Sequence, residues 1–192
     1  MERDTECRPS SPTRARRRGV PRAGSRWRPA YEPPAGYDTV QSTWEGFDQV
    51  PSAEIRIYSL PWQIAEKVHA YTDPHHRDCS NPDLMRPRDL LDPCRCATAT
   101  TPAARLESHE LRNALTRTFE HRRARDPSKH HLPSTLPPLP TSWVDGFMRQ
   151  VEQDALPWKS PEEAHALAAR LIDPVLGDQA SGTWDSQARV WK

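Results

Sequence analysis

Lys67 is the residue in this chain whose type and position are best suited to chemistry. It lies in the stretch 61–72, where Ile64, Val68 and Tyr71 recur at the spacing of one helical face. At about 100° per residue, Lys67 lies about 60° from Ile64 and therefore on the side that turns inward. Lysine is almost never fully buried unless it is paired. Its ammonium therefore either lies at the rim of the core, with the stem over apolar surface, or enters a cleft.

A basic and acidic cluster follows Lys67 further along the chain. It reads Arg-Pro-Arg-Asp-Leu-Leu-Asp (86–92), and a helix opened at Pro87 places Asp89 and Asp92 on one face. An acid in the first helical turn is also favoured by the macrodipole, and Arg88 can pair with Asp92 at i, i+4. The same combination is found where phosphate is handled. A lysine neutralises phosphate oxygens there, while a carboxylate holds Mg²⁺ or orients a hydroxyl.

Histidine, cysteine and aspartate also gather in two places that invite a zinc interpretation. The first group is His75, His76, Cys79 and Asp83, and the second is the pair Cys94 and Cys96. Neither spacing matches a compact zinc framework, and adjacent histidines do not easily face one ion. The four cysteines, without a secretory signal, are better interpreted as reduced thiols. We therefore predict no metal-ligand set among these residues.

The pattern of apolar residues predicts the elements that position these side chains. Alternation of polar and β-forming residues over 54–58 predicts a half-buried strand that leads into a helix over 61–72. A proline inside a helix costs about 3 kcal/mol. We therefore expect a short helix over 87–92 that ends before Pro93. Further helices are predicted over 107–122, 141–154 and 160–173, the last ending ahead of Pro174. The tail, with Trp184 and Trp191, is expected to pack as an irregular strand or lid.

Two of these stretches together resemble a known family. Ile-Ala-Glu-Lys-Val-His-Ala-Tyr-Thr (64–72) and the 86–92 motif are similar to the AbiEii/AbiGii-type nucleotidyltransferase toxins. That family shows a Glu-Lys helix and then a basic-x-basic-Asp-x-x-Asp motif about twenty residues later. The resemblance continues through the Leu-Pro-rich loop before Trp143 and through residues 164–176. It spans roughly residues 38–192.

The resemblance implies both a fold and an activity. The fold class is α+β, mostly α, with the remnant of a nucleotidyltransferase-like α/β domain over 36–100 and a helical domain over 101–192. The implied activity is transfer of a nucleotide from an NTP, with Mg²⁺, to a hydroxyl of an RNA such as tRNA or of a protein. Lys67 would bind the triphosphate, Asp89 would support the reacting hydroxyl or the lysine, and Arg86 and Arg88 would contact phosphate. A cognate antitoxin is the implied partner.

One departure from the family bears on activity. Such enzymes use a Gly-Ser turn followed by an Asp-x-Asp pair that holds Mg²⁺, and this sequence contains no Asp-x-Asp or Glu-x-Glu. Gly24-Ser25 is the nearest turn, and no acidic pair follows it. We therefore expect an N-terminally truncated family member that is impaired alone. A non-catalytic helical module that binds an antitoxin or RNA is the alternative. An unrelated structural or metal-binding protein is the third.

Composition sets the remaining expectations. With 28% charged and 35% hydrophobic residues and 21 prolines in 192, the core is modest in size. Residues 1–35 contain nine arginines against four acids and are predicted to be a disordered Arg/Pro-rich segment. A basic arm that binds RNA is the alternative for this segment. No apolar run is long enough for a membrane span or a signal peptide, so we expect a cytoplasmic protein without a membrane partner.

Overall fold

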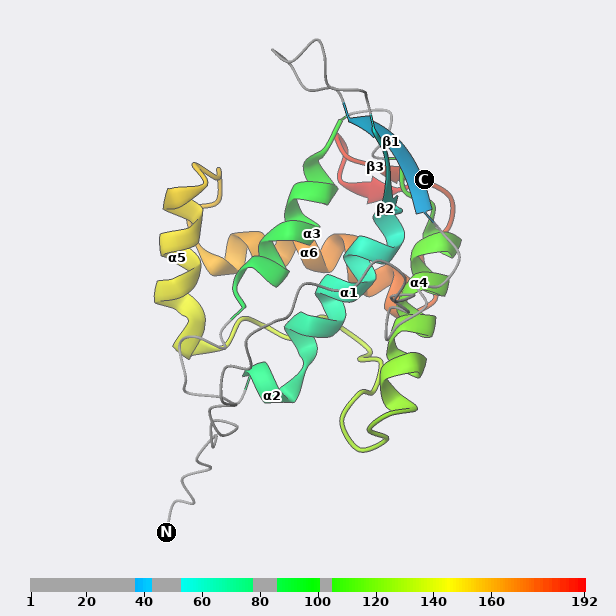
Figure 1. The fold of residues 1–192 in the computed structure, drawn as a ribbon. Helices are drawn as coiled ribbons and strands as arrows, with labels where there is room; N and C mark the ends of the chain where they lie inside the picture. The colour runs from blue at the N-terminus through cyan, green and yellow to red at the C-terminus, as the bar shows by residue number, and fades with distance from the viewer. Residues whose placement is uncertain (1–36, 43–52, 78–85, 101–104) are drawn as a thin grey trace, which may run out of the picture.

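Helices dominate the structure, with two short hairpins beside them (Figure 1). The computed structural model describes residues 37–42, 53–77, 86–100 and 105–192. The elements are β1 (Tyr37–Ser42), β2 (Ala53–Tyr58), α1 (Leu60–Thr72), α2 (Pro74–Arg77), α3 (Arg88–Thr98), α4 (Ser108–Arg123), the 3₁₀ turn η3 (Thr141–Trp143), α5 (Val144–Gln153), α6 (Pro161–Leu176), β3 (Trp184–Asp185) and β4 (Val190–Trp191). The fold is therefore α+β and mostly α, as predicted. The prediction for residues 1–35 lies outside the described residues.

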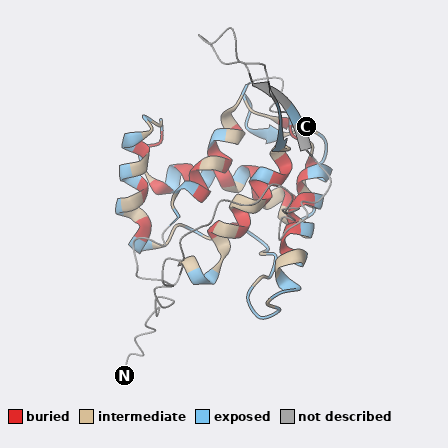
Figure 2. Ribbon diagram, in the orientation of Figure 1, coloured by how far each residue is buried: buried red, intermediate tan, exposed pale blue. Residues whose placement is uncertain are grey.

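The core is built on α1, which packs against α3 and α4, while α3 also packs against α6 (Figure 1). Ile64, Val68 and Tyr71 of α1 are each about 99% buried (exposed fraction 1%), so the predicted inward face is confirmed. The predicted apolar stripes of the later helices are buried as well (Figure 2): Leu111, Leu115, Phe119, Trp143, Phe147, Val151, Leu167 and Leu171. One cluster of buried residues runs through all of these helices. It joins residues from both sides of the predicted boundary near residue 100, and that boundary stays a prediction.

Two prolines lie inside helices, contrary to prediction. The helix expected to end at Asp92 continues through Pro93 to Thr98, and the last long helix continues through Pro174 to Leu176. A helical proline removes one backbone hydrogen bond and crowds the preceding turn. In α3 the residues beyond Pro93 include the fully buried Cys94 and Ala97. Burial of this apolar face offsets the cost of the proline.

The predicted strand exists, but its burial was predicted wrongly. β2 pairs antiparallel with β1, in a register that places Tyr37 opposite Tyr58 and Ser42 opposite Ala53. Residues 54–57 are all exposed, and Ile55 and Ile57 are 45% and 39% exposed. In the described part of the chain this hairpin forms a two-stranded sheet of its own, with no further strand beside it. The alternating pattern therefore faces solvent on both sides.

The proline-rich loop and the C-terminal tail hold the helices together. The Tyr71 hydroxyl donates to the carbonyl of Pro137 at 2.8 Å, and the backbone N–H of Leu136 donates to the Asp173 carboxylate at 2.7 Å. The indole N–H of Trp184 donates to the carbonyl of Ala97 near the end of α3 at 2.9 Å. The tail, which was expected to pack as an irregular strand or lid, forms the short antiparallel hairpin of β3 and β4. None of the described helices has the length and apolar character needed to cross a bilayer.

Candidate functional site

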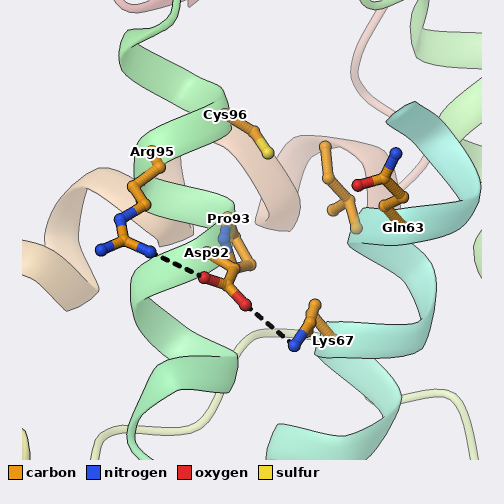
Figure 3. Close-up of a pocket in the computed structure, with 7 residues that line it drawn as sticks. Gln63, Lys67, Asp92, Pro93, Arg95 and Cys96 are labelled. Atoms are coloured by element: carbon orange, nitrogen blue, oxygen red, sulfur yellow. Dashed lines mark hydrogen bonds and ion pairs between the residues drawn. The ribbon is translucent and has the colours of Figure 1, made fainter. Parts of the chain in front are cut away.

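Lys67 reaches from α1 to α3 and meets both predicted aspartates. Its Nζ lies 3.3 Å from Oδ1 of Asp89 and 2.8 Å from Oδ2 of Asp92. Asp92 in turn pairs with Arg95 at 3.4 Å (Figure 3), and Arg95 pairs at 2.5 Å with Asp154, which directly follows α5. The i, i+3 spacing places the two aspartates on one face of α3, as predicted. We call Lys67, Asp89, Asp92 and Arg95 the lysine cluster.

Burial is unequal across the lysine cluster, and this sets the pKa values. The Asp89 side chain is 5% exposed, whereas that of Lys67 is 40% exposed. Burial raises the pKa of Asp89 above its usual value and outweighs the opposite effect of Lys67 and Arg86. Burial also opposes the charge of Lys67, but its hydrogen bonds and ion pairs with Asp92 and Asp89 leave its pKa raised. Oδ2 of Asp89 is buried and has no hydrogen-bond partner among the described residues. The negative charge of Asp89 is therefore only partly compensated, because Asp89 shares the Lys67 ammonium with Asp92.

The side chain of Lys67 lines two pockets. The smaller, of about 270 Å³, lies between α1 and α3 (Figure 3) and is lined by Gln63, Ile64, Lys67, Asp92, Pro93, Arg95 and Cys96. The larger, of about 380 Å³, is polar and is lined by Glu66, Lys67, His69, Ala70, Asp73, His76, Arg86, Asp89 and Arg122. Three basic side chains therefore meet in the larger pocket: Lys67, Arg86 and Arg122. Three acidic side chains, Glu66, Asp73 and Asp89, line the same pocket, and Glu66 pairs with Arg122, so Lys67 and Arg86 are the cations that an anionic ligand would meet there.

The two arginines that were predicted to contact phosphate lie in different places. Arg86 is exposed and lines the larger pocket with Lys67 and Asp89. Arg88 lies on the far side of α3, where its Nε donates to Oε1 of Gln150 in α5 at 2.7 Å. The pairing of Arg88 with Asp92 expected at i, i+4 is replaced by the pairing of Asp92 with Lys67 and Arg95. The structure thus brings Lys67, Asp89 and Arg86 together and leaves Arg88 apart.

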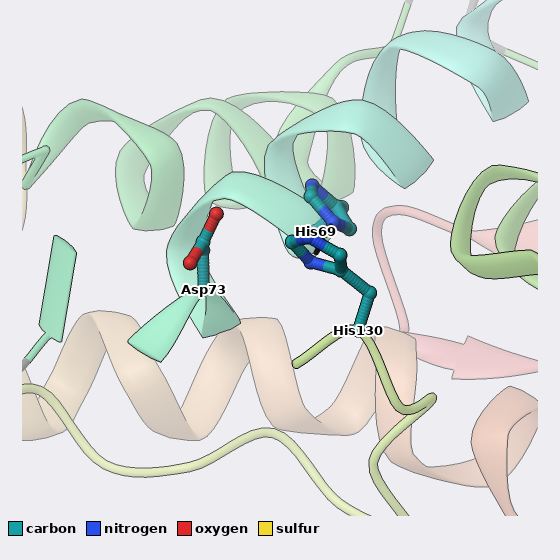
Figure 4. A group of neighbouring side chains, drawn as sticks. All are labelled: His69, Asp73 and His130. Carbon is teal, nitrogen blue, oxygen red and sulfur yellow. Dashed lines mark hydrogen bonds between the residues drawn. The ribbon is translucent and has the colours of Figure 1, made fainter. Parts of the chain in front are cut away.

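Sequence reasoning missed a second cluster on the same helix. The ring nitrogens Nε2 of His69 and Nδ1 of His130 lie 3.1 Å apart, and Asp73 lies one turn along α1 from His69 (Figure 4). We call these three residues the histidine cluster. The His69-x-x-x-Asp73 spacing was a visible signal, because i, i+4 residues share a helix face. The presence of His130 in this cluster could not be predicted from the sequence, because His130 lies in the loop after α4, far from His69 in the chain.

The carboxylates of this region do not form a resident Mg²⁺ site. Mg²⁺ requires near-octahedral oxygen ligation. In the described residues, Asp89 and Asp92 already face the Lys67 ammonium, and Glu66 pairs with Arg122 at 3.0 Å. The sequence also supplies no Asp-x-Asp pair. At Glu66, Asp89 and Asp92 a bound Mg²⁺ would have to displace a cationic side chain, so these three carboxylates do not fit it.

The cysteines do not form a zinc site in the described part of the chain. Burial raises the pKa of the Cys94 thiol to about 12 and that of Cys96 to about 11. Both are free thiols, and the Cys94 thiol donates to the carbonyl of Ala164. Zinc binds the thiolate, so these environments disfavour it. Of the other candidates, His75 and His76 lie in α2, and Cys79 and Asp83 lie outside the described residues.

The comparisons with known proteins bear on the whole arrangement. The family model described as nucleotidyl transferase AbiEii toxin, type IV TA system, matches residues 27–185. The match begins eleven residues before the resemblance placed at 38–192 and ends seven residues earlier. It includes Lys67, Arg86, Asp89 and both histidines of the histidine cluster. No curated protein and no solved structure matches the chain significantly. Because the family match covers well over half of the chain, the protein belongs to the AbiEii family of nucleotidyl transferase toxins of type IV toxin–antitoxin systems.

Proposed function

We propose that the chain binds the triphosphate of an NTP through Lys67 and takes part in nucleotidyl transfer to a hydroxyl of RNA, tRNA in particular, or of a protein. In that reaction the hydroxyl oxygen bonds to the α-phosphorus and the bond to the bridging oxygen breaks. Pyrophosphate then leaves, and the hydroxyl proton passes to solvent. A cognate antitoxin, implied by the family, would counteract the activity. We place the protein in the cytoplasm, where NTPs and tRNA are found.

The observation that carries this proposal is the position of Lys67. Its ammonium is held between two aspartates, while the Lys67 side chain as a whole remains 40% exposed and lines the larger pocket. A cation fixed in this way is preorganised for phosphate oxygens, because its orientation is set before the ligand arrives. Arg86 lines the same pocket and supplies a second charge. In nucleotidyl transfer the protein contributes mainly such positioning and charge neutralisation.

Asp89 acts on Lys67 rather than on the phosphate. Its Oδ1 accepts from Nζ of Lys67 at 3.3 Å, and its burial leaves little room for a direct contact with substrate. We therefore propose Asp89 as a positioning residue. Mg²⁺ would arrive bound to the phosphates of the NTP, which is its usual mode of binding in such enzymes. Because the sequence supplies no Asp-x-Asp pair, we propose that transfer by this chain alone is impaired.

The test is calorimetric titration of the full chain with each NTP in the presence of Mg²⁺. Lys67→Ala is expected to weaken binding at least about tenfold, the value of one charge-assisted hydrogen bond. Lys159→Ala is the matched control, because Lys159 is exposed at the start of α6, outside both pockets that Lys67 lines. Circular dichroism confirms that each variant is folded. Unchanged affinity in folded Lys67→Ala would contradict the proposal. Transfer itself is measured as label from an α-labelled NTP retained on tRNA.

A non-catalytic interaction module is the second candidate function. The exposed Ile55 and Ile57 on one face of β2 favour it, because exposed β-branched residues two apart form an apolar strip suited to a protein partner. On this alternative, antitoxin or RNA binding survives Lys67→Ala, and antitoxin binding is lost in Ile57→Asp. Lysine-dependent NTP binding would exclude a purely non-catalytic role.

A further inference from the structure

Two histidine rings in this structure face each other through their nitrogens. His69 comes from α1 and His130 from the loop after α4, and their Nε2 and Nδ1 atoms are 3.1 Å apart. Asp73 completes a group whose three ligand atoms all lie within 4.8 Å of one another (Figure 4). His69 is buried, whereas Asp73 and His130 are half-buried, so the group lies at the surface of the core.

The spacing is close to that of ligands around one zinc ion. Zinc binds imidazole nitrogen at about 2.0–2.1 Å in tetrahedral geometry, which separates two ligand nitrogens by about 3.3 Å. The two rings are already within a few tenths of an ångström of that value. The ligand atoms of the group lie within 4.8 Å of one another, so the Asp73 oxygen must move closer by up to about 1.5 Å to complete the set. Among the described residues, the Asp73 carboxylate accepts a hydrogen bond from the backbone N–H of His75 at 2.9 Å.

The surroundings hold the rings and leave the group able to accept a cation. The His69 ring packs edge-on against Phe119, with centroids 5.0 Å apart, which fixes its orientation. The Tyr71 hydroxyl ties the loop that carries His130 back to α1. The neighbouring cations are already paired: Arg122 with Glu66 at 3.0 Å and Lys129 with Asp126 at 2.9 Å. A dication would therefore meet one carboxylate and two imidazoles, the ligand types that zinc prefers.

We propose that His69, Asp73 and His130 bind a divalent transition-metal ion, with Zn²⁺ as the best match. Three protein ligands leave a fourth position, and the larger pocket, which His69 and Asp73 line, is where a water molecule would occupy it. The site does not depend on nucleotide binding at Lys67.

The experiment is titration of the metal-free full chain with Co²⁺ and with Zn²⁺. Cobalt in a tetrahedral site gives visible d–d absorption, and zinc affinity follows from competition with a chromophoric chelator. We expect one equivalent to bind. His130→Ala should weaken binding at least about a hundredfold, since it removes one of three ligands. His131→Ala is the matched control, because His131 is the exposed neighbour in the same loop. Its affinity should equal that of the wild type.

Two further measurements keep the proposal falsifiable if the variants are unstable. Added Zn²⁺ should shift the imidazole resonances of His69 and His130 in the wild-type chain and leave those of His165 unchanged. Thiolate-to-cobalt charge-transfer bands should be absent, because no cysteine is a ligand. Equal affinities of His130→Ala and wild type, unshifted histidine resonances, or strong thiolate bands would each overturn the assignment.

Discussion

The lysine cluster and the histidine cluster begin two residues apart on α1, yet their charges are balanced differently. In the lysine cluster every carboxylate meets a cation of the chain, from Asp89 through Lys67 and Asp92 to Arg95. In the histidine cluster two rings approach to 3.1 Å beside Asp73, a carboxylate that takes part in no ion pair among the described residues. The first is closed by its own ion pairs, and the second has room for a cation.

The difference shows what each cluster contributes. The lysine cluster joins α1 to α3, and it combines a poorly compensated buried acid with a lysine whose side chain is 40% exposed. Such an arrangement adds little to stability, because the desolvation of Asp89 opposes the gain from its ion pair. The histidine cluster joins α1 to a distant loop with donor atoms that a metal can share. An anionic ligand would therefore meet Lys67 on its exposed side, where Arg86 lines the same pocket, whereas a cation would meet the donor atoms of the histidine cluster.

The largest effect on stability is expected when the Lys67 ammonium is removed from the lysine cluster. Lys67→Ala leaves the Asp89 carboxylate buried without its cation, so it should lower the free energy of unfolding by about 1–3 kcal/mol near neutral pH. The value should lie near the lower end because Lys67 is 40% exposed. Adding Asp89→Asn removes the uncompensated charge and should restore at least half of the loss. Urea unfolding of the two single variants and the double variant measures the coupling. A double variant as unstable as the sum of its singles would show that the two residues do not interact.

A smaller effect is expected from Asp89→Asn alone, and it depends on pH. Burial raises the pKa of Asp89 in the folded chain, so the folded state holds that proton more tightly than the unfolded state does. The stability contributed by Asp89 is therefore present below the unfolded pKa and is lost as pH rises through the folded pKa. Asparagine does not titrate, so the stability of Asp89→Asn relative to wild type should increase as pH rises from about 4 to about 7. Thermal unfolding of both chains across this range tests the sign. A gain that shrinks with pH would show that Lys67 outweighs burial.

Local patterns in the sequence were sufficient to predict much of this arrangement. The inward face of α1, the position of Lys67 at its edge, and the shared face of Asp89 and Asp92 all follow from spacing within a few residues. The apolar stripes of α4, α5 and α6 were found in the same way. In each case, residues close in the chain decide the outcome.

The predictions that failed concern features that depend on residues distant in the sequence. Pro93 and Pro174 stay within helices because buried neighbours outweigh a local preference. The exposure of β2 depends on what lies beside it, which alternation cannot reveal. His130 is 61 residues from His69 in the chain, so no motif links them. Arg86 and Arg88 look equivalent in the sequence, and only the packing of α5 separates them.

The smallest effect is expected from a comparison of these two arginines. Both are exposed, so Arg86→Ala and Arg88→Ala should each change the free energy of unfolding by at most about 0.5 kcal/mol. NTP binding should separate them. Arg86 lines the pocket of Lys67, and its loss should weaken binding by about threefold to tenfold. Arg88 bonds to Gln150, so its loss should leave affinity unchanged. The reverse result would place the phosphates on the α5 side of α3, away from the larger pocket, where Lys67 could not reach them.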